Sequence, residues 1–183
     1  HLLPIYDRPM IYHPISRLAE AGIKDILIVT GGQHAGEFLR LLGNGHAFGL
    51  THLNYTYQEG EGGIAEALGL AKHFAQGKRM VVVLGDNIFE KSLKPYVDRF
   101  RRQKAGARVL LKRVPDPERF GVATVKGNKI VSITEKPRKP LSDLAVTGVY
   151  MYDEEAFSII RTLKHSRRGE LEITDVNNAY LDR

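Results

Sequence analysis

Apolar stretches of strand length alternate with amphipathic stretches of helical length through the first two-thirds of the chain. The first strand is expected at residues 26–29, where four apolar side chains follow one another. The elements expected after it are a helix at 34–42, a strand at 53–57, a helix at 62–74, a strand at 80–84 and a helix at 93–104. This order predicts a mostly parallel sheet with helices on both of its faces.

The pattern changes after Ala105, where strands follow one another closely. The expected elements are strands at 109–111, 121–125, 130–134 and 146–152, a tight turn at Gly127–Asn128, and helices at 155–163 and 171–181. Short connections between consecutive strands are typical of antiparallel pairing. We therefore expect an α/β fold whose mixed sheet has an antiparallel section in its second half, and a single domain over residues 1–183.

The composition is that of an ordinary globular domain. The 183 residues are 43% hydrophobic and 26% charged, which excludes a disordered or collagen-like chain. The sequence has no cysteine, so disulfides and thiolate metal sites are excluded, and a cytoplasmic location is expected. No apolar run approaches the roughly 20 residues that cross a bilayer, so we expect a soluble protein that does not bind membranes.

The net charge of +6 favours an anionic partner, although a basic surface kept for solubility explains it equally well. The basic clusters at 99–102, 138–139 and 167–168 fall in different elements, and the chain has no tryptophan to stack on bases. Nucleic acid is therefore not an expected partner. The seven histidines form no short-spaced pair, which argues against a zinc site.

The sharpest local signal is the end of the apolar strand at 80–84, which is followed by Gly85, Asp86 and Asn87. Ligands of open α/β sheets bind at the carboxyl ends of the strands, so Asp86 is expected to face a crevice there. A single carboxylate suits Mg²⁺, which completes its shell with water and substrate phosphates. The alternative is that Asp86 only caps the turn after the strand.

Two further segments stand at the ends of expected strands. Gln58 precedes a glycine-rich loop and the start of a helix, and its side-chain amide can pair with the edge of a nucleobase. Glu135 can accept hydrogen bonds from sugar hydroxyls, and Lys136 offers a point charge to a phosphate. A plain loop and a solvated strand edge explain the two segments equally well.

Six stretches of sequence follow one another in a recognisable order and span nearly the whole chain: residues 2–12, 84–89, 116–122, 135–137, 145–150 and 168–175. In this order they resemble the sugar-phosphate nucleotidyltransferases. The resemblance implies a Rossmann-like three-layer sandwich with a mixed, mainly parallel sheet and an antiparallel section. That fold is similar to the one expected from the alternation of strands and helices.

The resemblance implies a nucleotide-binding and metal-binding side of the site. Gln58 and Gly63 match the residues of the family that read the edge of the thymine base. Asp86 matches the Mg²⁺ ligand, so that it is implied both in nucleotide binding and in catalysis. The loop at 59–61 lacks the proline found in many thymidylyltransferases, which leaves the base preference open.

The resemblance also implies a sugar-phosphate side of the site. Gly121, Glu135 and Val146 match residues of the family that contact the sugar. Lys136 matches the residue that holds the sugar phosphate, and it is implied in catalysis together with the metal ligand. Phe120 stands where a tyrosine is common in the family, a change that keeps the ring and loses a hydroxyl.

The implied reaction transfers a nucleotidyl group from dTTP to glucose 1-phosphate, giving dTDP-glucose and pyrophosphate, with Mg²⁺ as cofactor. The same reaction with another base or sugar, by a uridylyl-, cytidylyl- or guanylyltransferase, remains an alternative. A binding module for nucleotide sugars that has lost catalysis is another. A glycosyltransferase is less favoured because Asp86-Asn87-Ile88 lacks the second aspartate of an Asp-x-Asp pair.

The resemblance further suggests that the chain is incomplete at both ends. The glycine-rich loop with its arginine, a lysine and the first strand of the sheet are expected before His1, and a second metal-binding aspartate after Arg183. We expect the 183-residue piece to be inactive alone, because donors that stabilise the developing charge would be missing. We also expect an unpaired apolar strand edge that favours self-association. A homo-oligomer is compatible with these observations.

Overall fold

The computed structural model describes residues 1–127 and 129–183, so the turn predicted at Gly127–Asn128 falls partly outside the described residues. The chain opens with a short antiparallel hairpin, β1 (Pro4–Ile5) and β2 (Arg8–Pro9). Helix α1 (Tyr12–Glu20) follows and was not among the expected elements. Its buried face is formed by apolar residues that recur at helical spacing, such as Ile15 and Leu18.

The next part of the chain is built from the expected β-α units. Its elements are β3 (Asp25–Gly31), α2 (Ala35–Leu42), the 3₁₀ turn η1 (His46–Phe48), β4 (His52–Gln58), α3 (Ile64–Leu70), α4 (Lys72–Ala75), β5 (Met80–Val83) and α5 (Lys94–Arg101). Strands β3 and β4 pair in parallel, with Gly31 opposite Gln58. The helix predicted at 62–74 is divided into α3 and α4 at Ala71.

The second part of the chain is the antiparallel section. Its elements are β6 (Arg108–Arg113), the 3₁₀ turn η2 (Pro117–Arg119), β7 (Gly121–Lys126), β8 (Lys129–Glu135), β9 (Leu144–Tyr152), α6 (Glu155–Ile160) and α7 (Ile173–Leu181). The long strand β9 is the centre of a five-stranded sheet. It pairs antiparallel with β5, β6 and β7, and β8 completes the sheet beyond β7.

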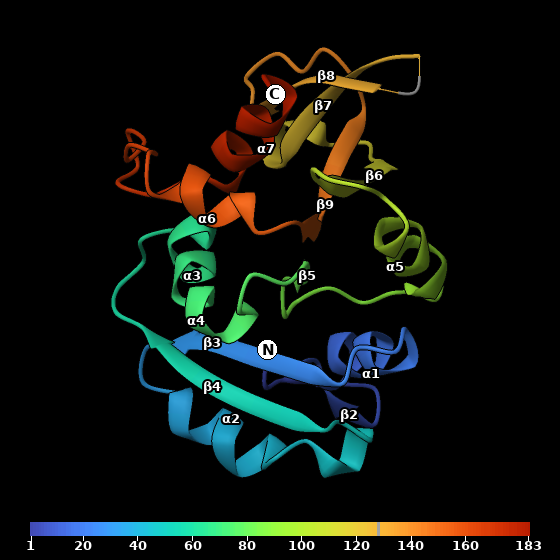
Figure 1. The fold of residues 1–183 in the computed structure, drawn as a ribbon, viewed down its shortest axis with the longest axis vertical. Coiled ribbons are helices and arrows are strands. Elements are labelled where there is room, and N and C mark those ends of the chain that lie inside the picture. Colours follow the sequence, from blue (N-terminus) through green and yellow to red (C-terminus); the bar gives the residue numbers. More distant parts are fainter. Residues whose placement is uncertain (128) are drawn as a thin grey trace.

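Two hydrophobic cores lie on the two faces of this sheet. Successive residues of a strand point to opposite faces, and accordingly Val149 and Met151 of β9 belong to one core while Tyr150 and Tyr152 belong to the other. Helices α1, α2 and α5 cover the first core, and α3, α4, α6 and α7 contribute to the second (Figure 1). The three-layer α/β sandwich expected from the sequence is therefore confirmed.

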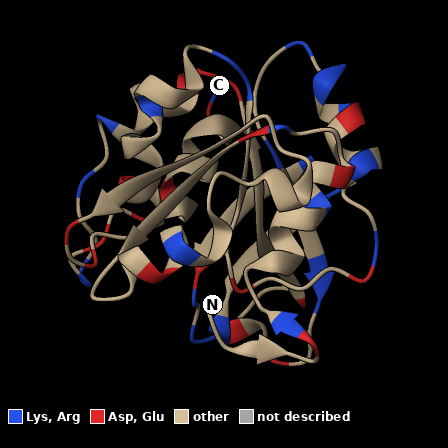
Figure 2. Ribbon diagram, turned by 90° about the horizontal axis from the view of Figure 1, so that it is seen from below, with Lys and Arg blue, Asp and Glu red and all other residues tan. Residues whose placement is uncertain are grey.

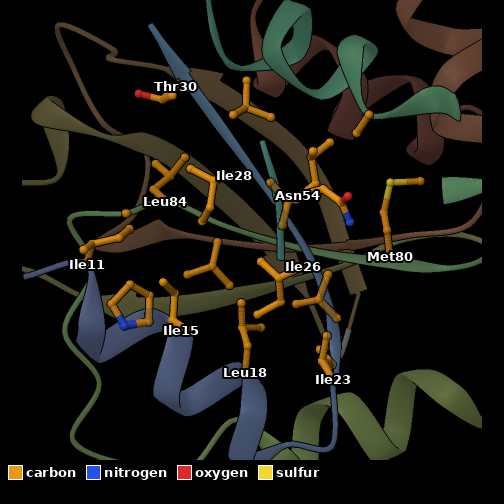
Figure 3. Close-up of a pocket in the computed structure, with 18 of the residues that line it drawn as sticks. Ile11, Ile15, Leu18, Ile23, Ile26, Ile28, Thr30, Asn54, Met80 and Leu84 are labelled. Atoms are coloured by element: carbon orange, nitrogen blue, oxygen red, sulfur yellow. The ribbon is translucent and has the colours of Figure 1, made fainter. Parts of the chain in front are cut away.

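The predicted dominance of parallel pairing is not observed. Among the described residues, β3 and β4 form the one parallel pair, and β3 is not hydrogen-bonded to β5. Residues 22–31 and 78–86 instead line a cavity of about 1550 Å³. Figure 3 shows Ile11, Ile15 and Ile28 among its largely carbon walls. The expected unpaired strand edge is thus present, because β3 and β5 each pair on one side within the described residues.

Lysines and arginines lie in several different elements, as the positions of the basic clusters in the sequence indicated. Figure 2 shows lysines and arginines spread over several elements and interspersed with acidic residues, without a single basic stripe along one element in this view. In residues 1–127 and 129–183, no helix is both long enough and apolar enough to cross a membrane.

Candidate active site

The site begins where β4 ends. The side chain of Gln58 is half-buried, and its Nε2 donates to the carbonyl oxygen of Gly63 at 3.2 Å and to Oε1 of Glu66 at 2.9 Å. The neighbouring strand approaches closely, because a Cβ on Gly31 would lie 2.6 Å from the carbonyl oxygen of Gln58. The absence of a side chain on Gly31 therefore leaves room for the end of β4.

The glycine-rich loop is attached to a distant segment of the chain. Gly63 has a φ of 93°, and a Cβ there would lie 2.6 Å from the carbonyl oxygen of Leu171. The Leu171 N–H donates to the carbonyl of Gly62 at 2.8 Å, and the Ala65 N–H donates to the carbonyl of Leu171 at 3.2 Å. The loop after β4 and the segment before α7 are thus held together through their backbones, and Gly63 is required at this contact.

A second group of predicted residues gathers at the end of β8. Glu135 lies opposite Gly121 in the β7–β8 pair, and the hydroxyl of Thr174 donates to Glu135 Oε2 at 2.6 Å. Thr174 is itself buried, at 5% exposure, in the first turn of α7. The carboxylate is therefore held in one orientation by a hydroxyl that reaches it from another element.

We expect Gly121→Ala to disturb this carboxylate. The added Cβ would lie 3.2 Å from Thr174 Oγ1 and 3.3 Å from Glu135 Oε2, so both groups must move by a few tenths of an ångström. Loss of one net hydrogen bond would raise about fivefold the dissociation constant of glucose 1-phosphate, the sugar phosphate that the family resemblance implies, and calorimetric titration measures this change. Gly36→Ala is the control, because no atom lies within 4 Å of its Cβ. Equal affinity of the two variants would contradict the expectation.

Arg168 is a site residue that the sequence analysis did not identify. Its Nη2 lies 3.8 Å from Glu135 Oε1 and 3.3 Å from Glu170 Oε2, and its guanidinium donates to both carboxylate oxygens of Glu172 at 2.9 and 2.8 Å. The hydrogen bond to Glu172 is the main cause that raises the pKa of Arg168. A signal was available, since Arg168 opens one of the six stretches that carry the family resemblance.

The electrostatics of this cluster favour charged side chains. Burial alone would raise the pKa of the Glu172 carboxyl, but hydrogen bonding to Ser166 and Arg168 and the charge of Lys136 outweigh it, and the pKa is lowered. Lys136 is exposed and has a left-handed backbone, with φ of 40°, and its N–H donates to the carbonyl of Phe120 at 3.0 Å. The ammonium of Lys136 is therefore available to an anion.

Asp86 is exposed in the turn after β5 and lines the large cavity together with Gln58. The turn is fixed by backbone hydrogen bonds, from the Leu84 N–H to the carbonyl of Gly148 at 3.0 Å and from the Asn87 N–H to the carbonyl of Leu84 at 3.2 Å. The carboxylate of Asp86 therefore faces solvent in the crevice and is not turned into the core.

Tyr150 shows that the two ends of the site face a common region. Burial raises the pKa of the Tyr150 phenol, and the negative charges of Glu135 and Asp86 raise it further. Both carboxylates therefore lie close enough to Tyr150 to act on the same hydroxyl. Asp86, in the turn after β5, and Glu135, the last residue of β8, thus both act on the phenol of Tyr150.

The donor set at Asp86 fits a hydrated Mg²⁺. In the part of the chain that the structure describes, no three histidine or acidic side chains come together as a metal cage. Asp86 offers one exposed carboxylate, and Mg²⁺ commonly takes one or two carboxylates and completes its shell with water and phosphates. Asp86 could therefore hold this ion as one ligand among several.

The remaining predicted residue, Val146, lies in β9. It is 8% exposed and belongs to the core that contains Ala123 and Ile133. The structure thus brings Gln58 together with Gly63, and Glu135 together with Lys136 and Gly121, while Val146 contributes mainly to packing. The role of Val146 as a sugar contact stays a prediction.

The comparisons with known proteins give the family. The model of the family described as "Nucleotidyl transferase" matches residues 1–183. The chain belongs to the nucleotidyl transferase family. Over 183 residues it is 45% identical to a glucose-1-phosphate thymidylyltransferase of Neisseria meningitidis serogroup A and 46% identical to one of Xanthomonas campestris pv. campestris. These alignments cover 99% of this chain but 63% and 62% of the relatives, so the chain spans less than two-thirds of their length.

Solved structures agree with this assignment of a nucleotidyl transferase domain. A Bacillus anthracis structure described as a glucose-1-phosphate thymidylyltransferase in complex with a sucrose is 54% identical, with a TM-score of 0.94 over 100% of this chain and 74% of that one. A UDP-glucose pyrophosphorylase complexed with UDP-glucose has a TM-score of 0.86 over 100% of this chain and 78% of that one. Its identity of 22% shows a shared fold alone. The predicted Rossmann-like α/β class is confirmed.

Proposed function

We propose that the protein to which this chain belongs transfers a thymidylyl group from dTTP to glucose 1-phosphate and releases pyrophosphate. The observation that carries the proposal is the grouping of the cations Lys136 and Arg168 near the carboxylate of Glu135. The loop after Gln58 is hydrogen-bonded through its backbone to Leu171, three residues after Arg168. Such a grouping suits a sugar phosphate next to a nucleotide. The names of the relatives support dTTP and glucose 1-phosphate as the substrates.

The proposed reaction is one displacement at phosphorus. A phosphate oxygen of glucose 1-phosphate attacks the α-phosphorus of dTTP, a new P–O bond forms, and the bond to the β-phosphate oxygen breaks, so that pyrophosphate leaves with the electron pair. Lys136 and Arg168 hold the sugar phosphate and offset its charge, which lets two polyanions approach. Glu135 accepts hydrogen bonds from the sugar hydroxyls. Mg²⁺ at Asp86 would offset the charge of the triphosphate.

The other predicted features belong to the proposal as well. The expected partners are small molecules, dTTP and glucose 1-phosphate, and the expected cofactor is Mg²⁺. The assignments of Gln58 and Gly63 to the base and of Gly121, Glu135 and Val146 to the sugar rest on the family resemblance. A cytoplasmic location, a single domain and a homo-oligomer stay predictions.

Competitive binding tests the proposal directly. Titration of the complete protein with dTTP, UTP, dCTP and dGTP in the presence of Mg²⁺, followed by glucose 1-phosphate, is expected to give the lowest dissociation constant for dTTP and a measurable one for glucose 1-phosphate. Mismatching one buried hydrogen bond costs about 1 to 3 kcal/mol, so dTTP is expected to bind about tenfold or more tightly than dCTP. Tighter binding of UTP would assign a uridylyltransferase instead. Absence of nucleotide binding would overturn the proposal.

A further inference from the structure

The side-chain amide of Gln58 is held by its donor end. Nε2 faces two acceptors, the carbonyl oxygen of Gly63 at 3.2 Å and the carboxylate of Glu66 at 2.9 Å. Turning the amide by 180° would place Oε1 against both of these oxygens, which cannot donate to it. The orientation of the amide therefore follows from the chemistry of its partners. In this orientation the side-chain oxygen, Oε1, takes part in neither of these two hydrogen bonds.

The position of Glu66 is built into the loop. Glu66 stands in the first turn of α3, three residues after Gly63, so that its side chain can fold back over the residues before the helix. A Cβ on Gly62 would lie 2.0 to 2.2 Å from the carboxylate atoms of Glu66. Only a glycine at position 62 leaves space for this carboxylate. The close approach of Gly62 thus serves the contact between Glu66 and Gln58.

The orientation of an amide decides which ring edges it can recognise. The ring nitrogen N3 of thymine or uracil carries a hydrogen and donates, whereas N3 of cytosine is an acceptor. An amide oxygen accepts from the first and repels the second, while an amide N–H would do the reverse. Gln58 stands at the end of β4 and is the residue to which the base is assigned.

We propose that Glu66 is a positioning residue that fixes the Gln58 amide with its oxygen toward the base, and thereby selects a pyrimidine with a protonated N3 over cytosine. The inference rests on the proposed function, because it assigns the base to Gln58. The selectivity for the base then depends on the carboxylate of Glu66, which acts through Gln58 and not by contact with the nucleotide. Without that carboxylate, Nε2 keeps its hydrogen bond to the Gly63 carbonyl and loses the one to Glu66.

The orientation can be tested without ligand. In ¹⁵N-labelled protein, the side-chain amide protons of Gln58 are assigned by comparison with Gln58→Ala, and their exchange with solvent is measured. Glu66→Ala is expected to accelerate the exchange about fivefold or more, as loss of a hydrogen bond of roughly 1 kcal/mol implies. Glu66→Gln is expected to restore slow exchange, because its amide oxygen still accepts. Unchanged exchange in Glu66→Ala would overturn the inference.

The consequence for selectivity is tested by the ratio of the dissociation constants of dCTP and dTTP. Glu66→Ala is expected to lower this ratio about fivefold to tenfold. Glu66→Gln is expected to lower it only slightly. Glu155→Ala is the control, because Glu155 is likewise in the first turn of a helix and forms an ion pair with the exposed Arg183. A ratio unchanged in Glu66→Ala, with dTTP still bound, would overturn the inference and leave the proposed function standing. Failure of the unmutated chain to bind any nucleotide would overturn the proposed function and the selectivity, while the exchange measurement still decides the orientation.

Discussion

Gly148→Ala is expected to lower the melting temperature of the chain by roughly 10 °C. Gly148 has φ of 68°, where a side chain costs about 1 kcal/mol. Its Cβ would also lie 2.7 Å from Asn87 Nδ2 and 2.9 Å from Leu84 Cδ1, so these side chains would have to shift, and overpacking of this kind costs about 1 to 3 kcal/mol. In a domain of this size, 1 kcal/mol corresponds to roughly 2 to 4 °C. Thermal unfolding followed by circular dichroism measures the change.

The same substitution at an unconstrained glycine is the control. Gly36 lies in α2 with no atom within 4 Å of an added Cβ, so Gly36→Ala is expected to be neutral or to raise the melting temperature slightly. The Gly148 variant should also bind Mg²⁺–dTTP more weakly, because the displaced Leu84–Asn87 turn carries Asp86. Equal melting temperatures for the two variants would contradict the close approach of β9 to this turn.

Lys136→Met is expected to weaken the binding of glucose 1-phosphate about 10- to 100-fold. A hydrogen bond to a charged group contributes about 1.5 to 3 kcal/mol, and Lys136 is the exposed cation that directly follows Glu135. Methionine keeps most of the length of the side chain and removes its charge. Isothermal titration with glucose 1-phosphate measures the loss, and titration with inorganic phosphate shows whether it arises at the phosphate group.

The neighbouring basic residue provides the control for Lys136. Lys139 is exposed three residues later in the same segment, so Lys139→Met removes the same charge from the surface. We expect it to change the dissociation constant less than twofold at 0.15 M salt, where exposed charges are screened beyond about 8 Å. Similar losses for both variants would show a general effect of net charge and would contradict a phosphate contact at Lys136.

The strands could be predicted because their apolar runs are local signals. The segments 26–29, 53–57 and 80–84 lie within β3, β4 and β5 or extend one residue beyond them. The break at Ala71 was not predicted, although Gly69, a weak helix former, stands two positions before it. It accompanies tertiary packing, since the second core joins α3 and α4 to α6, and a Cβ on Gly69 would be in van der Waals contact with Ile160.

The site was predictable to the extent that its residues stand at strand ends. Asp86, Gln58 and Glu135 were predicted in this way. Gln58 and Glu135 end their strands and Asp86 lies in the turn after β5, while their roles stay predictions. Their partners were not predictable, because Thr174 reaches Glu135 from 39 positions away and helix spacing gives no indication of such a contact. Arg168 and Glu172 pair with each other four residues apart, which in the sequence is indistinguishable from an ordinary surface ion pair.

The separation of β3 from β5 has a mechanical consequence. Gln58 belongs to the two-stranded sheet of β3 and β4. Glu135 belongs to the five-stranded sheet, and Asp86 lies in the turn after β5 of that sheet. No ladder of hydrogen bonds joins the two sheets within the described residues. Side-chain packing and the Gly62–Leu171 bridge hold them together instead. Because van der Waals contacts are less directional than a ladder of hydrogen bonds, the relative placement of Gln58 and Asp86 within these 183 residues depends on that packing and on the backbone bridge.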